Sequence, residues 1–383
     1  MDHHRQTKTA RRSRASLIIL ITLAFLLMAA AVVLVVSLPD DEAWQLPTAT
    51  SEPAGLSDAG FSCEAAEAQF LYPFGAGVMK LTRNRAAFLD LQGNELYAVD
   101  LDYSTPFAVS GSGLFLAADR DGHAYVLLSA TGTCYAGTLP GRISGASISP
   151  DGYVAIVQDQ SDSTGVVTLL APNTGAKLFD CYFPESGYVL SVSFPDQGGC
   201  FDVALLNTSA STAQPIIKRY SLEGKPLGQL KPDLTELYPL IAYDGQKHLV
   251  LGGAANLAAL SYDQGAILWQ RSFHQILAVR TVPAGLLVLA SDEQDGQFKL
   301  HLLQPDGKDK TVLPAGDTIT NLAVAGNRAA LGCGTRIIAA DSQTGTVILD
   351  KEAAAEVIRV GFTDSKTLII ITRNGVHRLS LPN

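Results

Sequence analysis

Tryptophan, paired cysteines and the short motifs of common enzymes are scarce or missing in this sequence. Its 383 residues include two Trp, and Trp44 lies in a segment rich in Pro and Thr. A cofactor stacked between aromatic rings would therefore find few partners. There is no Gly-x-Ser-x-Gly elbow and no phosphate-binding Gly-Lys-Ser/Thr loop. We assign no catalytic residue, no cofactor-binding residue and no cofactor from the sequence.

Cysteine usage is equally uninformative about chemistry. The five cysteines are an odd, scattered set without a Cys-x-x-Cys pair: Cys63, Cys134, Cys181, Cys200 and Cys333. They read either as free thiols within strands or, outside the cytoplasm, as the source of one bridge. Cys181 and Cys200 are the candidates for that bridge.

A net positive charge is found only at the N-terminal end of the chain. The formal net charge is −9, but residues 1–15 hold five bases and one acid, so the remainder carries −13. Phosphate backbones are bound by clustered Lys and Arg, so this composition predicts no nucleic-acid partner.

Residues 16–38 form the one apolar run long enough to span a bilayer. The run has 23 consecutive uncharged residues, which suffices for a hydrocarbon core of roughly 30 Å. A cleaved signal peptide is the alternative, although its apolar region is usually about 7–15 residues. Basic residues precede the run and Asp40, Asp41 and Glu42 follow it. We therefore predict a single-pass transmembrane helix in contact with lipid, with the N-terminus in the cytoplasm.

The flanking segments complete the predicted domain organisation. Residues 1–15 form a basic cytoplasmic tail, and residues 39–60, rich in Pro, Thr, Ser and acids, form a flexible stalk. Residues 61–383 contain short apolar runs separated by Gly, Asp, Asn, Ser and Pro, which is typical of an all-β domain. No amphipathic helix of normal length is evident, and residues 351–357 supply one helical turn at most.

An x-Gly turn between two apolar strands recurs along the all-β domain. Its glycines are Gly93, Gly132, Gly175, Gly224, Gly265, Gly307 and Gly345, at a mean interval of 42 residues. Between successive turns the pattern predicts four short strands, as in residues 237–273. A period near 42 with four strands each is typical of the blades of a β-propeller.

The length of the domain sets the number of blades. Residues 60–383 hold about 7.7 repeats, and three strands follow the last turn, at 357–362, 367–372 and 376–381. A closed ring needs a fourth strand there, and residues 61–69 are available to supply it. We therefore favour eight blades, with seven as the alternative.

The turns resemble the repeat of quinoprotein-like (PQQ-like) propellers, Ala-x-Asp-x-x-Thr-Gly-x-x-x-Trp. Ala339, Asp341, Thr344 and Gly345 match its first half, and Trp269 stands four residues after Gly265. Tyr97 and Phe179 hold the position of that Trp in two repeats, whereas Ala136, Gly228, Thr311 and Leu349 occupy it in four others. The whole chain resembles a family of membrane-anchored propeller proteins of unknown function from anaerobic Gram-positive bacteria. The resemblance implies a fold and a location, without an activity.

Potential metal ligands are dispersed over the repeats. No His has a second His or Cys at ligand spacing, and Asp119-x-Asp121-Gly122 lacks the Glu that completes a Ca²⁺ loop. We assign no metal-binding residue. The histidines of the propeller are His123, His248, His274, His301 and His377.

Three functional hypotheses follow. Propellers present variable loops at the mouths of a rigid ring, which favours an extracytoplasmic binding or scaffolding module for an envelope protein or a cell-wall component. The alternative is a carbohydrate-active enzyme whose acids come from several blades and form a cluster at one mouth. A sensor is a third hypothesis, but a tail of 15 residues would need a signalling partner.

Overall fold

The computed structural model describes residues 59–160, 165–184, 188–207, 214–244, 248–263 and 265–382. The predicted tail, transmembrane helix and most of the stalk, residues 1–58, lie outside the described residues. Within the described part of the chain, no helix is both long and apolar enough to cross a membrane.

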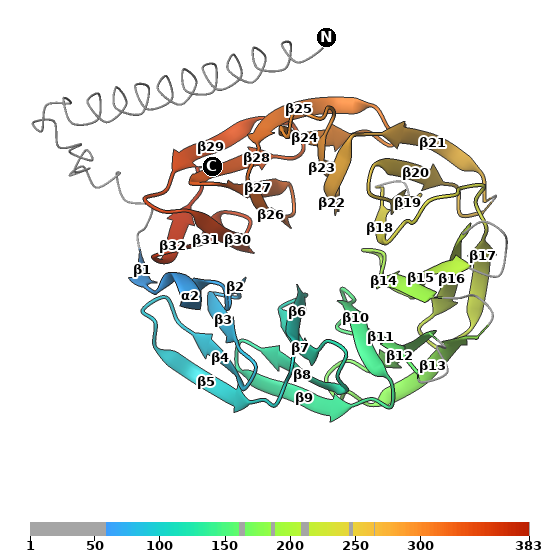
Figure 1. Cartoon of the computed structure of the whole chain (residues 1–383), viewed down its shortest axis with the longest axis horizontal. Coiled ribbons are helices and arrows are strands. Elements are labelled where there is room, and N and C mark those ends of the chain that lie inside the picture. Colours follow the sequence, from blue (N-terminus) through green and yellow to red (C-terminus); the bar gives the residue numbers. More distant parts are fainter. Residues whose placement is uncertain are drawn as a thin grey trace, which may run out of the picture. The chain divides into compact units, whose positions relative to one another are not determined.

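The described residues form a ring of eight four-stranded antiparallel sheets around a central opening (Figure 1). Each sheet is one blade, and seven of them use four consecutive strands. The first four blades in chain order are β2(Leu71–Phe74) β3(Gly77–Leu81) β4(Arg85–Leu89) β5(Glu95–Asp100); β6(Pro106–Gly111) β7(Leu114–Asp119) β8(Ala124–Ser129) β9(Gly132–Thr138); β10(Arg142–Ile148) β11(Val154–Asp159) β12(Gly165–Leu170) β13(Lys177–Phe183); and β14(Tyr188–Ser193) β15(Cys200–Asn207) β16(Gln214–Ser221) β17(Pro226–Leu230).

The remaining blades follow the same order, with the first strand of each innermost. They are β18(Leu240–Tyr243) β19(Leu249–Gly252) β20(Asn256–Leu260) β21(Ile267–Ser272); β22(Gln275–Val282) β23(Gly285–Ser291) β24(Phe298–Leu303) β25(Asp309–Gly316); β26(Ile319–Ala325) β27(Arg328–Cys333) β28(Arg336–Asp341) β29(Val347–Glu352); and β30(Val357–Asp364) β31(Thr367–Thr372) β32(Gly375–Ser380), completed by β1(Ala59–Ser62).

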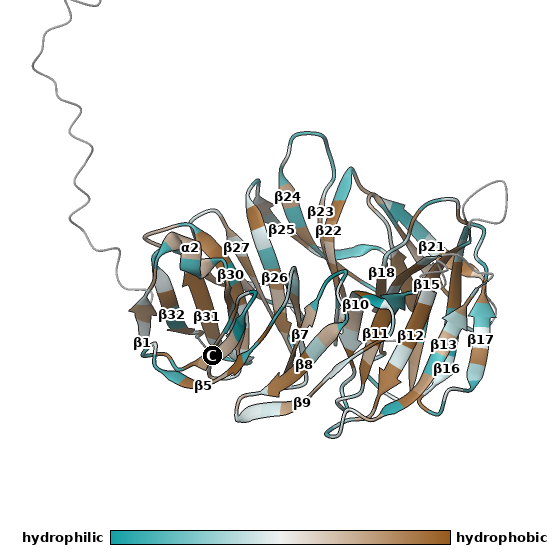
Figure 2. Cartoon of the chain, turned by 60° about the horizontal axis from the view of Figure 1, so that its bottom comes forward, coloured by the Kyte–Doolittle hydropathy of each residue, from teal (hydrophilic) through white to brown (hydrophobic). Residues whose placement is uncertain are grey.

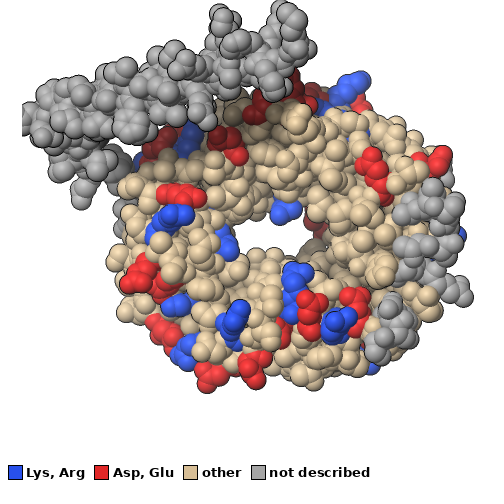
Figure 3. All heavy atoms as spheres, in the orientation of Figure 1, with Lys and Arg blue, Asp and Glu red and all other residues tan. Residues whose placement is uncertain are grey.

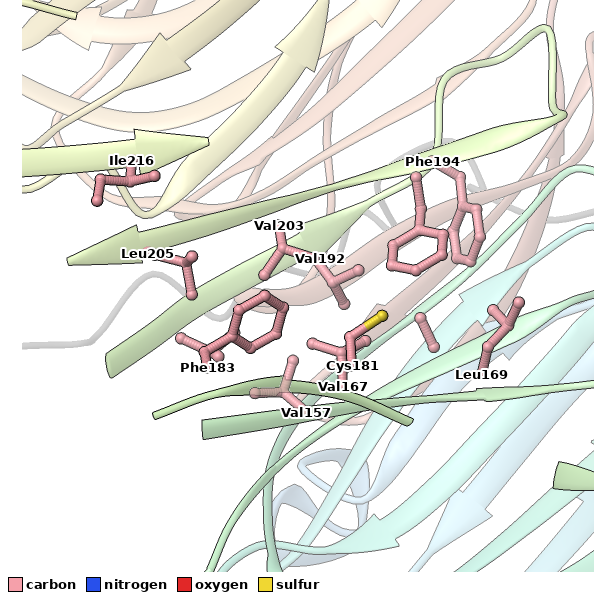
Figure 4. Close-up of a cluster of buried hydrophobic side chains, with 13 residues drawn as sticks. Val157, Val167, Leu169, Cys181, Phe183, Val192, Phe194, Val203, Leu205 and Ile216 are labelled. Carbon is pink, nitrogen blue, oxygen red and sulfur yellow. The ribbon is translucent and has the colours of Figure 1, made fainter. Parts of the chain in front are cut away.

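The two middle strands of each blade are apolar on both faces because they are sandwiched between neighbouring blades. Residues of β31, for example, are buried throughout, whereas the outermost strands alternate between half-buried and exposed positions. One cluster joins β10–β13 to β14–β17 through Val167, Phe183, Val203 and Leu205 (Figure 4). Figure 2 shows hydrophobic colouring along the strands and hydrophilic colouring at many loops. The core is thus a series of layers between blades.

The ring is closed by its N-terminal strand. β1 pairs antiparallel with β32, with Ala59 opposite Arg378 and Ser62 opposite Gly375. This confirms eight blades, and the alternative of seven is wrong. The closing strand begins two residues before the predicted domain boundary at residue 61. The rest of the predicted segment does not continue the strand, because Ala65–Ala68 forms the short helix α2.

The helical turn considered for residues 351–357 is wrong. Lys351 and Glu352 end β29, which completes the blade of β26–β29. Because Lys351 pairs with Ile337 of β28, the strand satisfies backbone groups that a helical turn would have left without partners.

The turn glycines are contact points between neighbouring blades. Gly307 has φ +80°, and a Cβ there would lie 2.6 Å from the Trp269 ring of the preceding blade. Trp269 also donates Nε1–H to the carbonyl of Pro305 at 2.7 Å. Phe179 packs on Gly224 in the same way. Glycine is required here because it tolerates positive φ and leaves space for the ring.

The docking aromatic is better preserved than the sequence suggested. The ring of Tyr135, rather than Ala136, packs on Gly175, and Phe61 of the closing strand packs on Gly93. Gly132 differs from the other turn glycines with φ +140°, and it already belongs to β9. The turn before β9 is therefore shorter, which moves the docking position one residue toward the N-terminus.

Candidate functional site

A β-bulge recurs in five of the innermost strands and gives a common reference point for comparing residue positions along them. β10, β14, β22, β26 and β30 each carry one near their start, at 143/145, 189/191, 276/278, 319/321 and 357/359. Residues at equal distance from this bulge therefore occupy equivalent levels of the central channel. Asn321 and Arg359 are equivalent on this scale, and Arg280 stands two residues further along its strand.

The larger of two cavities along the central channel, of about 450 Å³, lies at the mouth where the innermost strands end. Its walls come from four consecutive blades, through the loop after β14, the end of β18, the loop after β22 and the end of β26. Asp196, Gln197, Arg219, Asp244 and Thr281 supply polar groups. Loops from several blades thus converge on one cavity with mixed polar and apolar walls.

Arg219, which lines this cavity, belongs to a buried ion pair. Arg219 on β16 donates Nε–H and Nη2–H to the two carboxylate oxygens of Asp202 on β15, at 2.9 and 2.6 Å. The Asp202 side chain is 0% exposed and that of Arg219 is 17% exposed. The guanidinium lies 3.6 Å from the centroid of the Tyr262 ring in the next blade. The pair therefore joins two blades.

Tyr243 on β18 completes this network. Its hydroxyl donates to Asp202 Oδ2 at 3.0 Å and is also within 3.2 Å of the Ser193 carbonyl. Burial and the neighbouring Asp202 charge raise the pKa of Tyr243 well above its ordinary value, so the phenol remains a donor. Burial raises the pKa of Asp202, and the Arg219 hydrogen bonds oppose that rise. The network thus ties a buried carboxyl group to one cation and one phenol donor.

The smaller cavity, of about 330 Å³, lies along the channel wall between β26, β30, β2 and β6. Arg359 on β30 stacks on the Tyr72 ring, 4.2 Å from its centroid. Its Nη1 donates to the carbonyls of Gln69 and Leu71, both at 2.9 Å. Asn321, at the equivalent level of β26, bonds both backbone groups of Val360. Asn321 thus links β26 to β30, and Arg359 links β30 to β2.

The two cavities meet at Val324, which lines both. Figure 3 shows basic side chains bordering the central opening near β26, β30 and β6, with acidic atoms on the side of β14 and β18. This half of the channel is our candidate functional site, which we call the channel site. It comprises the walls of the two cavities.

The candidate residues weighed in the sequence do not assemble. Among the described residues there is no group of three His, Cys, Asp or Glu that could hold a metal ion. His248 Nδ1 lies 2.7 Å from the acceptor Asp244 Oδ2 beside the larger cavity, whereas His301 is buried between β21 and β25. Asp119 caps a blade turn by accepting the Thr105 N–H. The five cysteines are free thiols, so the Cys181–Cys200 bridge is absent.

Sequence reasoning missed the charged groups in and next to the channel site. Arg280 and Arg359 stand inside the apolar runs Leu-Ala-Val-Arg-Thr-Val and Val-Ile-Arg-Val-Gly, and Asp202 inside Cys-Phe-Asp-Val-Ala. A charge in the middle of an apolar strand was the available signal, because burying it without a partner is costly.

We predict that stability falls as the pH is lowered through the range where histidine titrates. Burial lowers the pKa of His301, helped by Arg271 and opposed by Asp309 and Asp292, and burial also lowers the pKa of His377. Their folded pKa values thus lie below the unfolded value of about 6.5. Between those values the unfolded chain binds more protons, so the free energy of unfolding decreases as pH falls.

Denaturant unfolding at a series of pH values measures this dependence. The variant carrying His301→Gln and His377→Gln should have a smaller pH slope near 6 than the wild type, whatever its absolute stability. An unchanged slope would show that these two imidazoles do not contribute. Gln92→Ala, on an exposed turn, removes no titratable group and is the control, and its slope should equal that of the wild type.

The model of a family of unknown function, DUF5711, matches residues 59–381. The chain belongs to this family. The match runs from β1 to the residue after β32, so the DUF5711 region coincides with the closed ring. No curated protein matches the chain.

Solved structures that resemble the DUF5711 ring share its fold at low sequence identity. Sqt1 of Saccharomyces cerevisiae aligns with a TM-score of 0.63 and 12% identity, covering 86% of this chain and 100% of its own. Sqt1 of Chaetomium thermophilum gives 0.60 and 11%, with coverage of 85% and 99%. BamB of Moraxella catarrhalis gives 0.51 and 13%, with coverage of 84% and 99%. These likenesses establish the propeller architecture alone.

Proposed function

We propose that this protein is a membrane-tethered extracytoplasmic propeller that binds or scaffolds an envelope protein or a cell-wall component through the channel site. The observation that carries the proposal is the convergence of loops from four blades on one 450 Å³ cavity at a mouth of the ring. The location rests on the apolar run at residues 16–38 and the basic residues before it.

The polar groups of the channel site support binding better than catalysis. Arg219 is engaged by Asp202, and Asp244 accepts the backbone N–H of its own turn residue His248 at 2.8 Å. Burial raises the pKa of Cys200, which disfavours a reactive thiolate. These groups hold the walls in place and leave a shaped, mostly rigid surface.

The carbohydrate-active alternative retains one supporting observation. Asp196 and Asp244 both line the larger cavity, as an acid cluster at a mouth would require. However, Asp244 is only 4% exposed and is held by His248, which leaves Asp196 as the exposed acid of the pair. Glycoside hydrolysis needs two available carboxyl groups, so this function ranks second.

Site-specific photo-crosslinking in native membranes tests the proposal. A photoreactive residue at Gln197 in the full chain should capture a reproducible partner, whether protein or wall polymer. The same residue at Lys308, on an exposed outer turn, is the control and should not capture it. Absence of any reproducible adduct at Gln197, or equal capture at both positions, would contradict the proposal.

A further inference from the structure

Arginine is the predominant charged residue of the innermost strands, although the protein as a whole is acidic. Their charged residues are Arg142, Arg280, Arg359 and one acid, Asp364. Asp364 ends β30 at the mouth, where it accepts the backbone N–H of Lys366 at 2.7 Å. The innermost strands therefore contribute more positive than negative charge to the channel, while Asp196 and Asp244 add acidic groups at the mouth of the larger cavity.

Two of these arginines have no acidic partner among the described residues. Arg280 donates to the carbonyl of Val279, and Arg359 uses only Nη1 for its two carbonyls. Burial lowers the pKa of both guanidinium groups, and no carboxylate contributes to either shift. Because arginine remains protonated, both keep their charge inside the ring. Such a cleft concentrates anions between low-dielectric walls.

The two guanidinium groups stand at different levels and on different blades. Arg359 lies two residues beyond the start of the bulge and Arg280 four residues beyond it. At about 3.3 Å per residue, their strand positions differ by about 7 Å along the channel. Charges arranged in this way suit an elongated anion better than a single compact one.

The channel wall also offers contacts that a peptide can use. β22 and β30 are terminal strands of their sheets, so each has one edge that no strand of its own sheet pairs with. Leu277, three residues before Arg280, is 41% exposed. Strand edges and apolar side chains favour an extended polypeptide over a phosphate polymer.

We propose that the central channel takes an extended, acidic polypeptide segment of the partner, with carboxylates on Arg280 of β22 and on Arg359 of the smaller cavity. This inference rests on the proposed binding function and names the chemistry of its ligand. Residues 59–383 carry a formal charge of −8, so the protein as a whole does not attract an acidic segment. Attraction by the two arginines acts only within the channel, because salt screens their charge beyond about 8 Å under physiological conditions.

Peptide binding to the full-length protein in detergent tests this assignment. A fluorescent peptide with Asp alternating with Val should bind, and the matched peptide with Asn in place of Asp should bind about tenfold or more weakly. Arg280→Gln should produce a similar loss for the Asp peptide. Lys308→Gln, which removes one positive charge from an outer turn, should leave binding unchanged.

The outcomes separate this inference from the broader proposal. Equal binding of the Asp and Asn peptides, or wild-type affinity in Arg280→Gln, overturns it. Binding of linear inorganic polyphosphate without binding of the Asp peptide assigns the channel to phosphate polymers and also overturns it. In each of these cases a partner captured at Gln197 would still support the proposed function. Arg359→Lys keeps a positive charge, so retained binding in that variant shows that the ring itself is intact.

Discussion

Deleting residues 59–62 from the full chain is expected to lower the free energy of unfolding by about 3–6 kcal/mol. The estimate combines about 1 kcal/mol for each net backbone hydrogen bond with about 1–2 kcal/mol for the Phe61 side chain. Phe61 contacts both the closing blade and Gly93 of the next blade. The deletion would open the ring and expose the edge of β32, so aggregation should accompany the loss of stability.

Denaturant unfolding and light scattering measure the two effects. Deletion of residues 44–47, upstream of the ring, is the control of equal length and should leave both unchanged. If the chain lacking 59–62 unfolded at the denaturant concentration of the wild type, the closing strand would be dispensable.

Arg219→Ala is expected to destabilise the protein by about 3–5 kcal/mol, because it leaves a carboxylate buried without its cation. Asp202 is fully buried, and Tyr243 remains its neutral donor. The loss should be larger at pH 8 than at pH 5. A buried acid with a raised pKa binds a proton more readily in the folded state, so stability falls as pH rises.

Two further variants identify burial as the cause. Arg336 makes the same two-point contact with Asp350, but the two side chains are 41% and 45% exposed, so Arg336→Ala should cost at most about 1 kcal/mol. Replacing Asp202 and Arg219 together by Leu should be less harmful than Arg219→Ala alone, since no orphaned charge remains. Equal losses for Arg219→Ala and Arg336→Ala would refute this account of the pair.

Much of the ring could be predicted from local sequence. The turn glycines with positive φ and the apolar strands beside them recur at the period of one blade, and strand predictions such as 367–372 match β31. The errors arose where tertiary contacts outweigh local pattern. Helix α2 interrupts the predicted closing segment, and Tyr135 replaces Ala136 because one turn is shorter.

The channel site could not be predicted in the same way. Asp202 and Arg219 are partners because β15 and β16 pair in one register, and Tyr243 joins them from another blade. The sequence alone determined an all-β repeat of four-stranded units, because periodicity is local, and it favoured eight blades without excluding seven. Only the tertiary structure decided which charges meet and which remain unpaired, because ring closure brings together residues as distant as Gln69 and Arg359.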